Sequence, residues 1–338
     1  MKELLLRAVH SPVGTQAIAQ LERMDAWRSQ EDWLRVLTYH RVIDPAGDPT
    51  VYPRIAVTPQ AFAEQMAFVA QHYRVISMQE LLDYRRGSCC LPPRALLITF
   101  DDGYTDFAEH AWPILRRHGL PVTLFVPTAF PDSGESFWWD RLYHALMVTQ
   151  AQEVTSPGGV LPLGSRAERE RAFTRLREQV KSLPHQEAMA LVQEICQGLG
   201  VEPPPSAILG WDALRRLAEE GVTLGAHTRT HPLMNRLSLE EARAEAVGSL
   251  RDLEREIGSA LPIFAYPSGG ISPEVEAMLA QEGFALAFTT YRKLNRLNPR
   301  QGPEWLRLGR INVGPRTSLT LLRAQLLLWS ASLARPFA

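Results

Sequence analysis

Two short runs of the sequence carry residues that can do chemistry together. The first, 99–104, places Asp101 and Asp102 directly after an apolar segment with the length and residue types of a buried strand. The second, 227–231, places His227 and His231 four residues apart after another strand-like segment. One Asp and two His form a ligand set that leaves a catalytic Zn²⁺ an open position for water. The spare carboxylate beside them can act as a base, so the two runs predict metal-assisted hydrolysis.

Each run has a structural alternative. Asp-Asp-Gly is common turn chemistry, because Asp caps helices and Gly allows sharp turns. Two His at a spacing of four could be surface residues on one helical turn. The joint pattern favours function, because both runs follow strand-like segments and functional groups collect at the carboxyl ends of parallel strands.

The elements that must position these residues alternate between strands and helices, which indicates a parallel α/β fold. A helix is expected after the N-cap residue Thr58, another after the capping box that begins at Ser77, and a third over 104–118. Seven or eight such units predict a closed or nearly closed β/α barrel. The predicted strands are 33–39, 73–76, 95–100, 122–126, 222–226, 262–266, 286–289 and 308–313.

We divide the chain into an N-terminal helical extension (1–30), a barrel (31–315) and a C-terminal helix (316–338). A helical insertion at about 149–205 interrupts the barrel, either as a lid or wall of the site or as an excursion with no role in binding. The apolar stretch 318–334 includes Leu322, Leu326 and Trp329 on one helical face. It is expected to pack on the domain, with a membrane-surface helix as the alternative.

Composition narrows the function classes. The 338 residues are 45% hydrophobic, and 36 Lys+Arg against 37 Asp+Glu give a net charge of −1. This balance lacks the excess of basic residues that would indicate nucleic-acid binding. The odd number of cysteines and the absence of a signal-peptide pattern or transmembrane run favour the cytoplasm or its membrane face. The sequence carries no signal for the oligomeric state.

The runs 99–104 and 227–231 resemble the first two motifs of the polysaccharide deacetylase family. Members of this family are metal-dependent esterases and amidases that remove acetyl groups from N-acetylated sugars. The run 37–42 resembles the start of a bacterial branch linked to exopolysaccharide synthesis. The resemblance extends from about residue 36 to 313, and it implies a distorted, incomplete parallel (β/α) barrel of about seven strands.

By this resemblance Asp102, His227 and His231 would bind one divalent ion, with Zn²⁺ the best match to the ligands. Asp101 would be the general base that takes a proton from the attacking water. Consecutive side chains at a strand end point different ways, which allows this division between the two carboxylates. The backbone N–H of Tyr104 would help to hold the oxyanion of the substrate.

Two departures from the family pattern put other residues in question. The third motif matches 265–270, with Ala265 where an Arg that steadies the base would stand. Arg310 is the candidate replacement, with an ordinary barrel-rim Arg as the alternative, and Tyr266 of the same motif is assigned to substrate binding. The late Leu-x-His motif, source of the general acid, is missing. His40 would fill this role across the metal from Asp101 if the barrel is permuted; a capping or core histidine is the alternative.

The run 137–141 combines two Trp with Asp and Arg after a loop. Sugars stack on indole rings, so Trp139 and Asp140 are expected at the rim of a sugar site, although core packing would explain at least one Trp. The leading function is N-deacetylation of a saccharide of a bacterial polysaccharide or its precursor. The alternatives are a metal-dependent amidase or esterase on another substrate and a non-catalytic carbohydrate-binding or scaffold protein. An aspartyl phosphatase is disfavoured, because that chemistry uses Asp-x-Asp.

Overall fold

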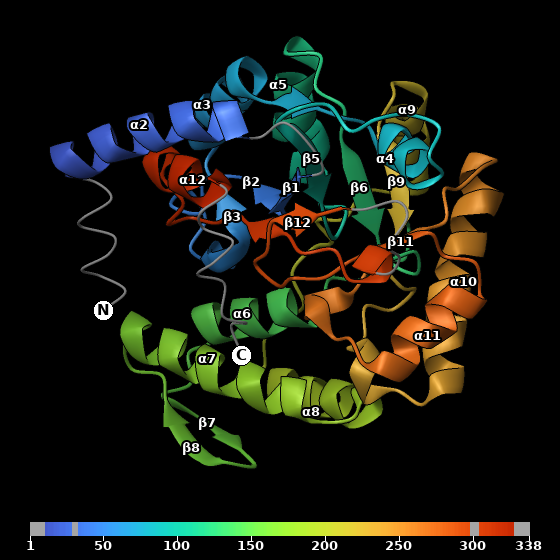
Figure 1. Ribbon diagram of the computed structural model, residues 1–338. Coiled ribbons are helices and arrows are strands. Elements are labelled where there is room, and N and C mark those ends of the chain that lie inside the picture. The colour runs from blue at the N-terminus through green and yellow to red at the C-terminus, as the bar shows by residue number, and fades with distance from the viewer. Residues whose placement is uncertain (1–10, 29–32, 298–303, 328–338) are drawn as a thin grey trace.

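A curled, mostly parallel sheet forms the centre of the molecule. The computed structural model describes residues 11–28, 33–297 and 304–327 (Figure 1). Seven strands of the described chain follow one another in the order β11-β10-β9-β6-β5-β1-β12, while β4 pairs with β5 and β13 pairs with β1. These strands are β1 (Trp33–Tyr39), β4 (Arg74–Val75), β5 (Ala95–Phe100), β6 (Thr123–Val126), β9 (Thr223–Ala226), β10 (Ile263–Ala265), β11 (Leu286–Phe288), β12 (Asn295–Arg296) and β13 (Ile311–Asn312).

The curled sheet is a distorted, incomplete (β/α) barrel, which confirms the predicted fold class. All its pairings are parallel except that of β12 with β1. The segment 308–313 lies between the two ends of the barrel, because Leu308 pairs with Phe288 of β11 and β13 pairs with Leu37 and Thr38 of β1. These short pairings bring the side chains of this segment into the barrel.

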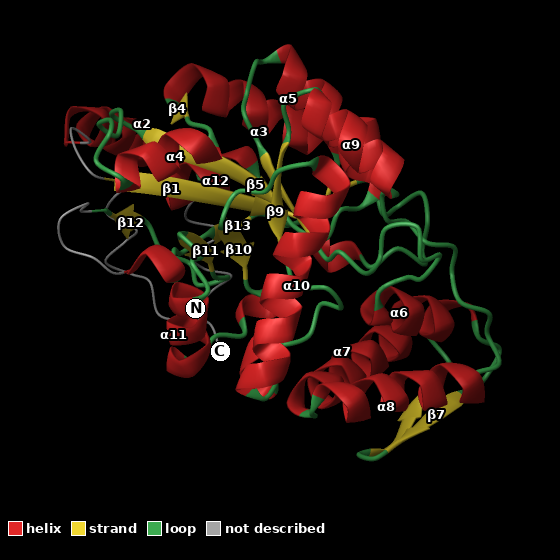
Figure 2. Ribbon diagram, turned by 90° about the vertical axis from the view of Figure 1, so that its right-hand side faces the viewer, coloured by secondary structure: helices red, strands yellow, loops and turns green. Residues whose placement is uncertain are grey.

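Helices surround the sheet as the alternating pattern predicts (Figures 1 and 2). Thr58 and Ser77 cap α3 and α4 through their side chains, and Ser77 forms the predicted capping box with Glu80. Apolar helix faces complete the core against buried strand residues such as Leu96 and Ile98. The helices around the sheet are α3 (Pro59–His72), α4 (Met78–Arg85), α5 (Trp112–Arg117), α9 (Trp211–Glu219), α10 (Leu239–Ile257) and α11 (Pro273–Gln281).

The predicted helix over 104–118 is not regular. Residues Phe107–Ala111 form a π-helical turn that leads into α5. Pro113 explains part of this irregularity, because a proline has no backbone N–H to donate to the preceding turn.

A separate lobe lies beside the barrel and corresponds to the predicted insertion (Figure 2). It contains α6 (Trp138–Val148), α7 (Arg166–Ser182) and α8 (His185–Gly198), which share one hydrophobic cluster. The lobe therefore starts near Trp138, before the expected boundary at about 149. It also contains a β-hairpin, β7 (Glu153–Ser156) and β8 (Gly159–Pro162), where only helix was expected. The turn at 157–158, with Gly159 at φ +103°, allows this hairpin.

The chain ends add two helices to the barrel. They are α2 (Pro12–Arg28) and α12 (Leu319–Leu326), and Arg323 of α12 forms a two-bond ion pair with Glu22 of α2. Leu322 and Leu326 are buried in the barrel core, as expected for a helix packed on the domain. Residues 1–10 and 328–338, including Trp329, lie outside the described residues. Within the described ranges, no helix has the length and apolar character needed to cross a bilayer.

A small parallel pair, β2 (Arg41–Val42) and β3 (Ala56–Val57), follows β1. Asp106 holds this segment, since its carboxylate accepts hydrogen bonds from Arg41 Nε and from the backbone N–H of Val42, both at 2.7 Å. The chain leaving β1 is thereby fixed where His40 stands between the two strands.

Candidate metal-dependent hydrolase site

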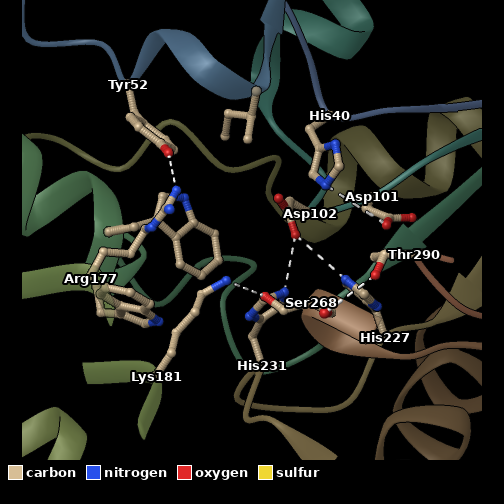
Figure 3. A pocket seen from close by; sticks show the side chains of 13 residues that line it. His40, Tyr52, Asp101, Asp102, Arg177, Lys181, His227, His231, Ser268 and Thr290 are labelled. Atoms are coloured by element: carbon tan, nitrogen blue, oxygen red, sulfur yellow. Dashed lines mark hydrogen bonds and ion pairs between the residues drawn. The ribbon is translucent and has the colours of Figure 1, made fainter. Parts of the chain in front are cut away.

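The carboxyl ends of three parallel strands meet at one pocket. Asp101 and Asp102 follow β5, His227 and His231 follow β9, and His40 follows β1, and all five line the same hollow (Figure 3). β5 pairs with β1 on one side and β6 on the other, and β6 pairs with β9, so the strand order explains this convergence. The cavity volume of the pocket is about 130 Å³.

Asp102, His227 and His231 have the arrangement of a metal-ligand set. All three are buried, and one candidate ligand atom from each lies within 4.8 Å of the others. Asp102 Oδ1 is 3.6 Å from Nε2 of His227 and 3.4 Å from Nε2 of His231. This oxygen is buried and has no hydrogen-bond partner among the described residues. An orphaned buried oxygen facing two imidazole nitrogens fits a divalent cation.

The orientation of His227 is fixed from behind. Its Nδ1 donates to the backbone carbonyl of Ala265 at 2.7 Å, which leaves the Nε2 lone pair directed at Asp102. Such a bond to the second ring nitrogen is usual for metal-binding histidines. Ala265 therefore contributes its carbonyl to the site, although its side chain replaces the Arg of the family motif.

Electrostatic interactions keep the trio of Asp102, His227 and His231 in forms that can bind a cation. Burial opposes ionisation of Asp102, but its contacts with His227 and His231 outweigh this and hold the pKa of the carboxyl well below its usual range. Burial lowers the pKa of the His231 imidazole, although Asp102 opposes that shift. An ionised carboxylate and a neutral imidazole are the forms that bind metals.

The backbone at the site is strained, and nearby groups hold it in place. Asp102, Thr228 and His231 have φ values of +76°, +66° and +59°, a region that non-glycine residues rarely adopt. Glu245 of α10 accepts hydrogen bonds from the backbone N–H groups of residues 229 and 230 at 2.7 and 2.9 Å. The loop 227–231 is therefore not a helical turn, and its two imidazoles converge because the loop is folded around the Glu245 carboxylate.

Arg310 binds Asp101 in a bidentate ion pair. Nη1 and Nη2 of Arg310 each lie 2.7 Å from one carboxylate oxygen, and Nε donates to the carbonyl of Thr289 at 2.9 Å. Burial alone would raise the pKa of Asp101, but the charge and hydrogen bonds of Arg310 lower it. The structure thus brings Arg310, from the segment that spans the barrel ends, to the carboxylate that the missing motif Arg would serve.

Replacing Arg310 with Met should destabilise the protein strongly. The substitution leaves the Asp101 carboxylate buried without its partner, and breaking such a pair costs about 3–5 kcal/mol. Urea unfolding should show this loss, and Asp101→Asn in the same chain should recover part of it by removing the buried charge. Arg166→Met is the matched control, since Arg166 and Glu170 form an exposed ion pair, for which about 0–1 kcal/mol is expected. Equal unfolding free energies for the Arg310 and Arg166 variants would contradict this account.

His40 lies beside Asp101 and not across the pocket from it. Its Nε2 is 4.0 Å from Asp101 Oδ2, because the β1 strand that ends at Tyr39 pairs directly with β5. This contact differs from the expected position across the metal from Asp101, and the adjacency of β1 and β5 explains how His40 reaches the pocket. Its role as general acid stays a prediction.

The aromatic run 137–141 divides differently from the prediction. Trp139 lines the pocket, but it also stacks on Phe137 and donates Nε1–H to the Tyr104 hydroxyl at 2.8 Å. Trp138 lines the pocket as well and is the more exposed indole. Trp138 was not predicted as a site residue, because adjacent helical residues cannot be assigned to a face without knowing what the helix packs against.

Asp140 does not reach the pocket. Its Oδ2 accepts a hydrogen bond from the Tyr104 hydroxyl at 2.7 Å, and burial raises the pKa of this carboxyl to about 6. The Tyr104 ring is buried beneath the site, with Arg41 over its face at 4.4 Å. The backbone N–H of Thr105 donates to the carbonyl of Ala207, and the N–H of Leu209 donates to the carbonyl of Gly103. Neither of these hydrogen bonds uses the N–H of Tyr104.

The prediction that Tyr266 contacts the substrate is wrong. Its side chain is fully buried, and its hydroxyl donates to the carbonyl of Leu306 at 2.8 Å.

The pocket has other polar lining residues that the sequence did not predict, because they come from the lobe and from loops far away in the chain. These are Tyr52, Arg177, Lys181, Ser268 and Thr290.

The fold and the site together are those of a β/α-barrel protein with a candidate Asp-His-His metal-ligand set. Sequence comparison places the chain within a family. The polysaccharide deacetylase family model matches residues 89–287, more than half of the chain. This protein belongs to the polysaccharide deacetylase family. The matched residues include the trio and Asp101, whereas His40 and Arg310 lie outside them.

Individual relatives share shorter stretches. Over 124 residues the chain is 33% identical to the poly-beta-1,6-N-acetyl-D-glucosamine N-deacetylase of Escherichia coli strain K12. The matched stretch covers 35% of this chain and 18% of that protein. A protein of the same name from Staphylococcus epidermidis is 28% identical over 102 residues, covering 27% and 35% of the two chains. The chain thus matches only a minor part of the length of these relatives.

Solved structures share the fold over most of the chain. IcaB from Ammonifex degensii superposes with a TM-score of 0.58 at 22% identity, covering 88% of this chain and 98% of that one. The deacetylase PplD from Streptococcus pyogenes, in complex with acetate, gives a TM-score of 0.58 at 18% identity over 87% and 98% of the chains.

Proposed function

We propose that this protein is a metal-dependent hydrolase that removes N-acetyl groups from sugars of a bacterial exopolysaccharide or its precursor. The observation that carries the proposal is the convergence of Asp102, His227 and His231 in one pocket with the Arg310-bound carboxylate of Asp101. The relatives named as poly-beta-1,6-N-acetyl-D-glucosamine N-deacetylases support the reaction class. Two imidazoles and one carboxylate suit Zn²⁺.

The residues divide the work according to their contacts. A divalent ion on the trio would supply Lewis acidity, polarising the acetyl carbonyl and making the attacking water more acidic. Asp101, held ionised by Arg310, accepts the proton of that water. The backbone N–H of Tyr104, two residues after Asp102 in the chain, would stabilise the oxyanion. His40 protonates the leaving amine.

Two other functions compete with this one. A non-catalytic carbohydrate-binding protein would have no need of a buried, partnerless Asp102 oxygen or of an ion pair holding Asp101. An amidase or esterase for a non-sugar substrate would use the same metal set, but Trp138 and Trp139 at the pocket favour a sugar, whose flat C–H faces stack on indoles.

The direct test is metal analysis combined with acetate release. Protein stripped with a chelator and reloaded with Zn²⁺ should release acetate from an N-acetylglucosamine oligomer, while the stripped form should not. A loaded protein that releases no acetate from any N-acetylated saccharide, yet still binds saccharide, would favour the non-catalytic alternative.

His40→Ala should slow amide hydrolysis by about 10²–10⁴-fold, the usual contribution of general acid–base catalysis. An activated phenyl acetate should lose much less, because its leaving group needs little protonation. The measurement is kcat for each of the two substrates, at saturating concentration, in the His40→Ala variant and the unchanged protein. Equal losses would show that His40 acts through its neighbour Asp101, 4.0 Å away, and not as the acid.

A further inference from the structure

Helix α7 of the lobe projects two cations into the metal-site pocket. Arg177 and Lys181 are four residues apart, which puts them on the same face of the helix, and both line the pocket (Figure 3). The adjoining side of α7 is fixed by Phe173, Leu176 and Val180, which are buried in the core of the lobe. The lobe therefore presents positive charge to the site from a rigid support.

Neither cation has an acidic partner within the described part of the chain. Arg177 Nη1 donates to the Tyr52 hydroxyl at 2.7 Å, and Lys181 Nζ donates to Ser268 Oγ at 3.0 Å. Arg177 Nε is buried and has no acceptor among the described residues. The buried Arg310, by contrast, is paired with a carboxylate. Two cations with only neutral partners retain hydrogen-bonding capacity for an anion.

Arg177 and Lys181 are not needed to neutralise the negative charges of Asp101 and Asp102. With a divalent ion on the trio, the ion and Arg310 already outweigh the negative charges of Asp101 and Asp102. Burial and the neighbouring Arg177 lower the pKa of Lys181 to about 8, although Asp102 opposes this shift. A bound anion would offset the repulsion between Arg177 and Lys181.

A second hollow adjoins the first at Lys181. It shares Trp138, Lys181, His231 and Ser268 with the metal-site pocket and continues past Met189 of α8. Its further lining is largely apolar. A ligand that extends from the first hollow into the second passes Lys181.

We propose that Arg177 and Lys181 bind an oxyanion, a phosphate or a carboxylate, on the saccharide next to the N-acetyl sugar that is hydrolysed. This inference rests on the proposed function and deepens it, because it names acidic saccharides as the substrate class. The planar guanidinium of Arg177 matches the two-oxygen face of either anion, and Lys181 adds a point charge. A neutral N-acetylglucosamine polymer would leave both cations without a counter-charge.

The test compares three substrates on the Zn²⁺-loaded full chain by acetate release. They are a neutral N-acetylglucosamine oligomer, an oligomer of equal length in which glucuronate neighbours the N-acetylglucosamine, and an N-acetylglucosamine phosphodiester. We expect at least one acidic substrate to exceed the neutral one by about 10–100-fold in kcat/KM, the value of one or two charge-assisted hydrogen bonds. The carboxylate and phosphate arms identify the source of the anion.

Substitutions then assign the preference to the two cations. Arg177→Gln and Lys181→Gln should each reduce the ratio of acidic to neutral kcat/KM by about tenfold or more, mainly through KM. Arg171→Gln, on the exposed side of the same helix, is the matched control and should keep the ratio. Calorimetric binding of the same three saccharides to the Asp101→Asn protein gives a readout that does not depend on turnover.

The outcomes separate this inference from the proposed function. Equal or better turnover of the neutral oligomer would overturn the acidic-substrate inference and leave the deacetylase function intact. Absence of acetate release from all three substrates would contradict the proposed function. In that case the binding experiment still decides, since acidic ligands that bind no tighter than the neutral one would overturn the role of Arg177 and Lys181.

Discussion

Asp101→Asn should lower kcat by about 10²–10⁴-fold while the protein keeps its metal. Asn preserves the shape of the side chain but cannot accept the proton of the attacking water. The two oxygens of Asp101 are bound by Arg310, whereas the ligand-set oxygen belongs to Asp102. Metal content by mass spectrometry and steady-state acetate release on the same samples make the check.

The control for this variant is Glu22→Gln. Glu22 is a partly buried carboxylate in an ion pair, with Arg323 of α12 at 2.6 Å, and it does not line the pocket. Its substitution should therefore remove a paired carboxylate away from the site and keep most of the turnover. If Asp101→Asn loses the metal while Asp102→Asn retains it, the roles of the two carboxylates are reversed.

Replacing His227 and His231 together with Ala should abolish metal retention and activity at the same time. Removal of both imidazoles leaves Asp102 as the sole member of the trio, and one carboxylate cannot hold a divalent ion against dialysis in the way three ligands can. Activity should fall to the level of the chelator-treated protein, and added Zn²⁺ should not restore it. The measurement is metal content after dialysis, followed by acetate release.

His118→Ala is the control for a lost imidazole, because His118 is an exposed residue at the end of α5. This variant should keep both metal and turnover. Full metal occupancy in the His227/His231 double variant would refute the ligand assignment.

The local chemistry of the sequence determined the strands, the helix starts and the reactive residue types. β1 and β5 have the predicted bounds, because runs of seven and six residues rich in apolar side chains fit buried parallel strands. The caps at Thr58 and Ser77 also form as predicted, since side chain and backbone partners lie within one turn. Polar residues directly after such strands had to collect at one edge of the sheet.

Only the tertiary structure decided which residues from distant segments meet. Arg310 reaches Asp101 because the segment 308–313 spans the barrel ends, and Arg177 and Lys181 reach the pocket because the lobe folds beside it. Tyr266 and Asp140 point away from the pocket for the same reason, as each hydrogen-bonds a partner far away in the chain. Sequence periodicity fixes the face of an element, but the partner of that face depends on long-range packing, which no local pattern contains.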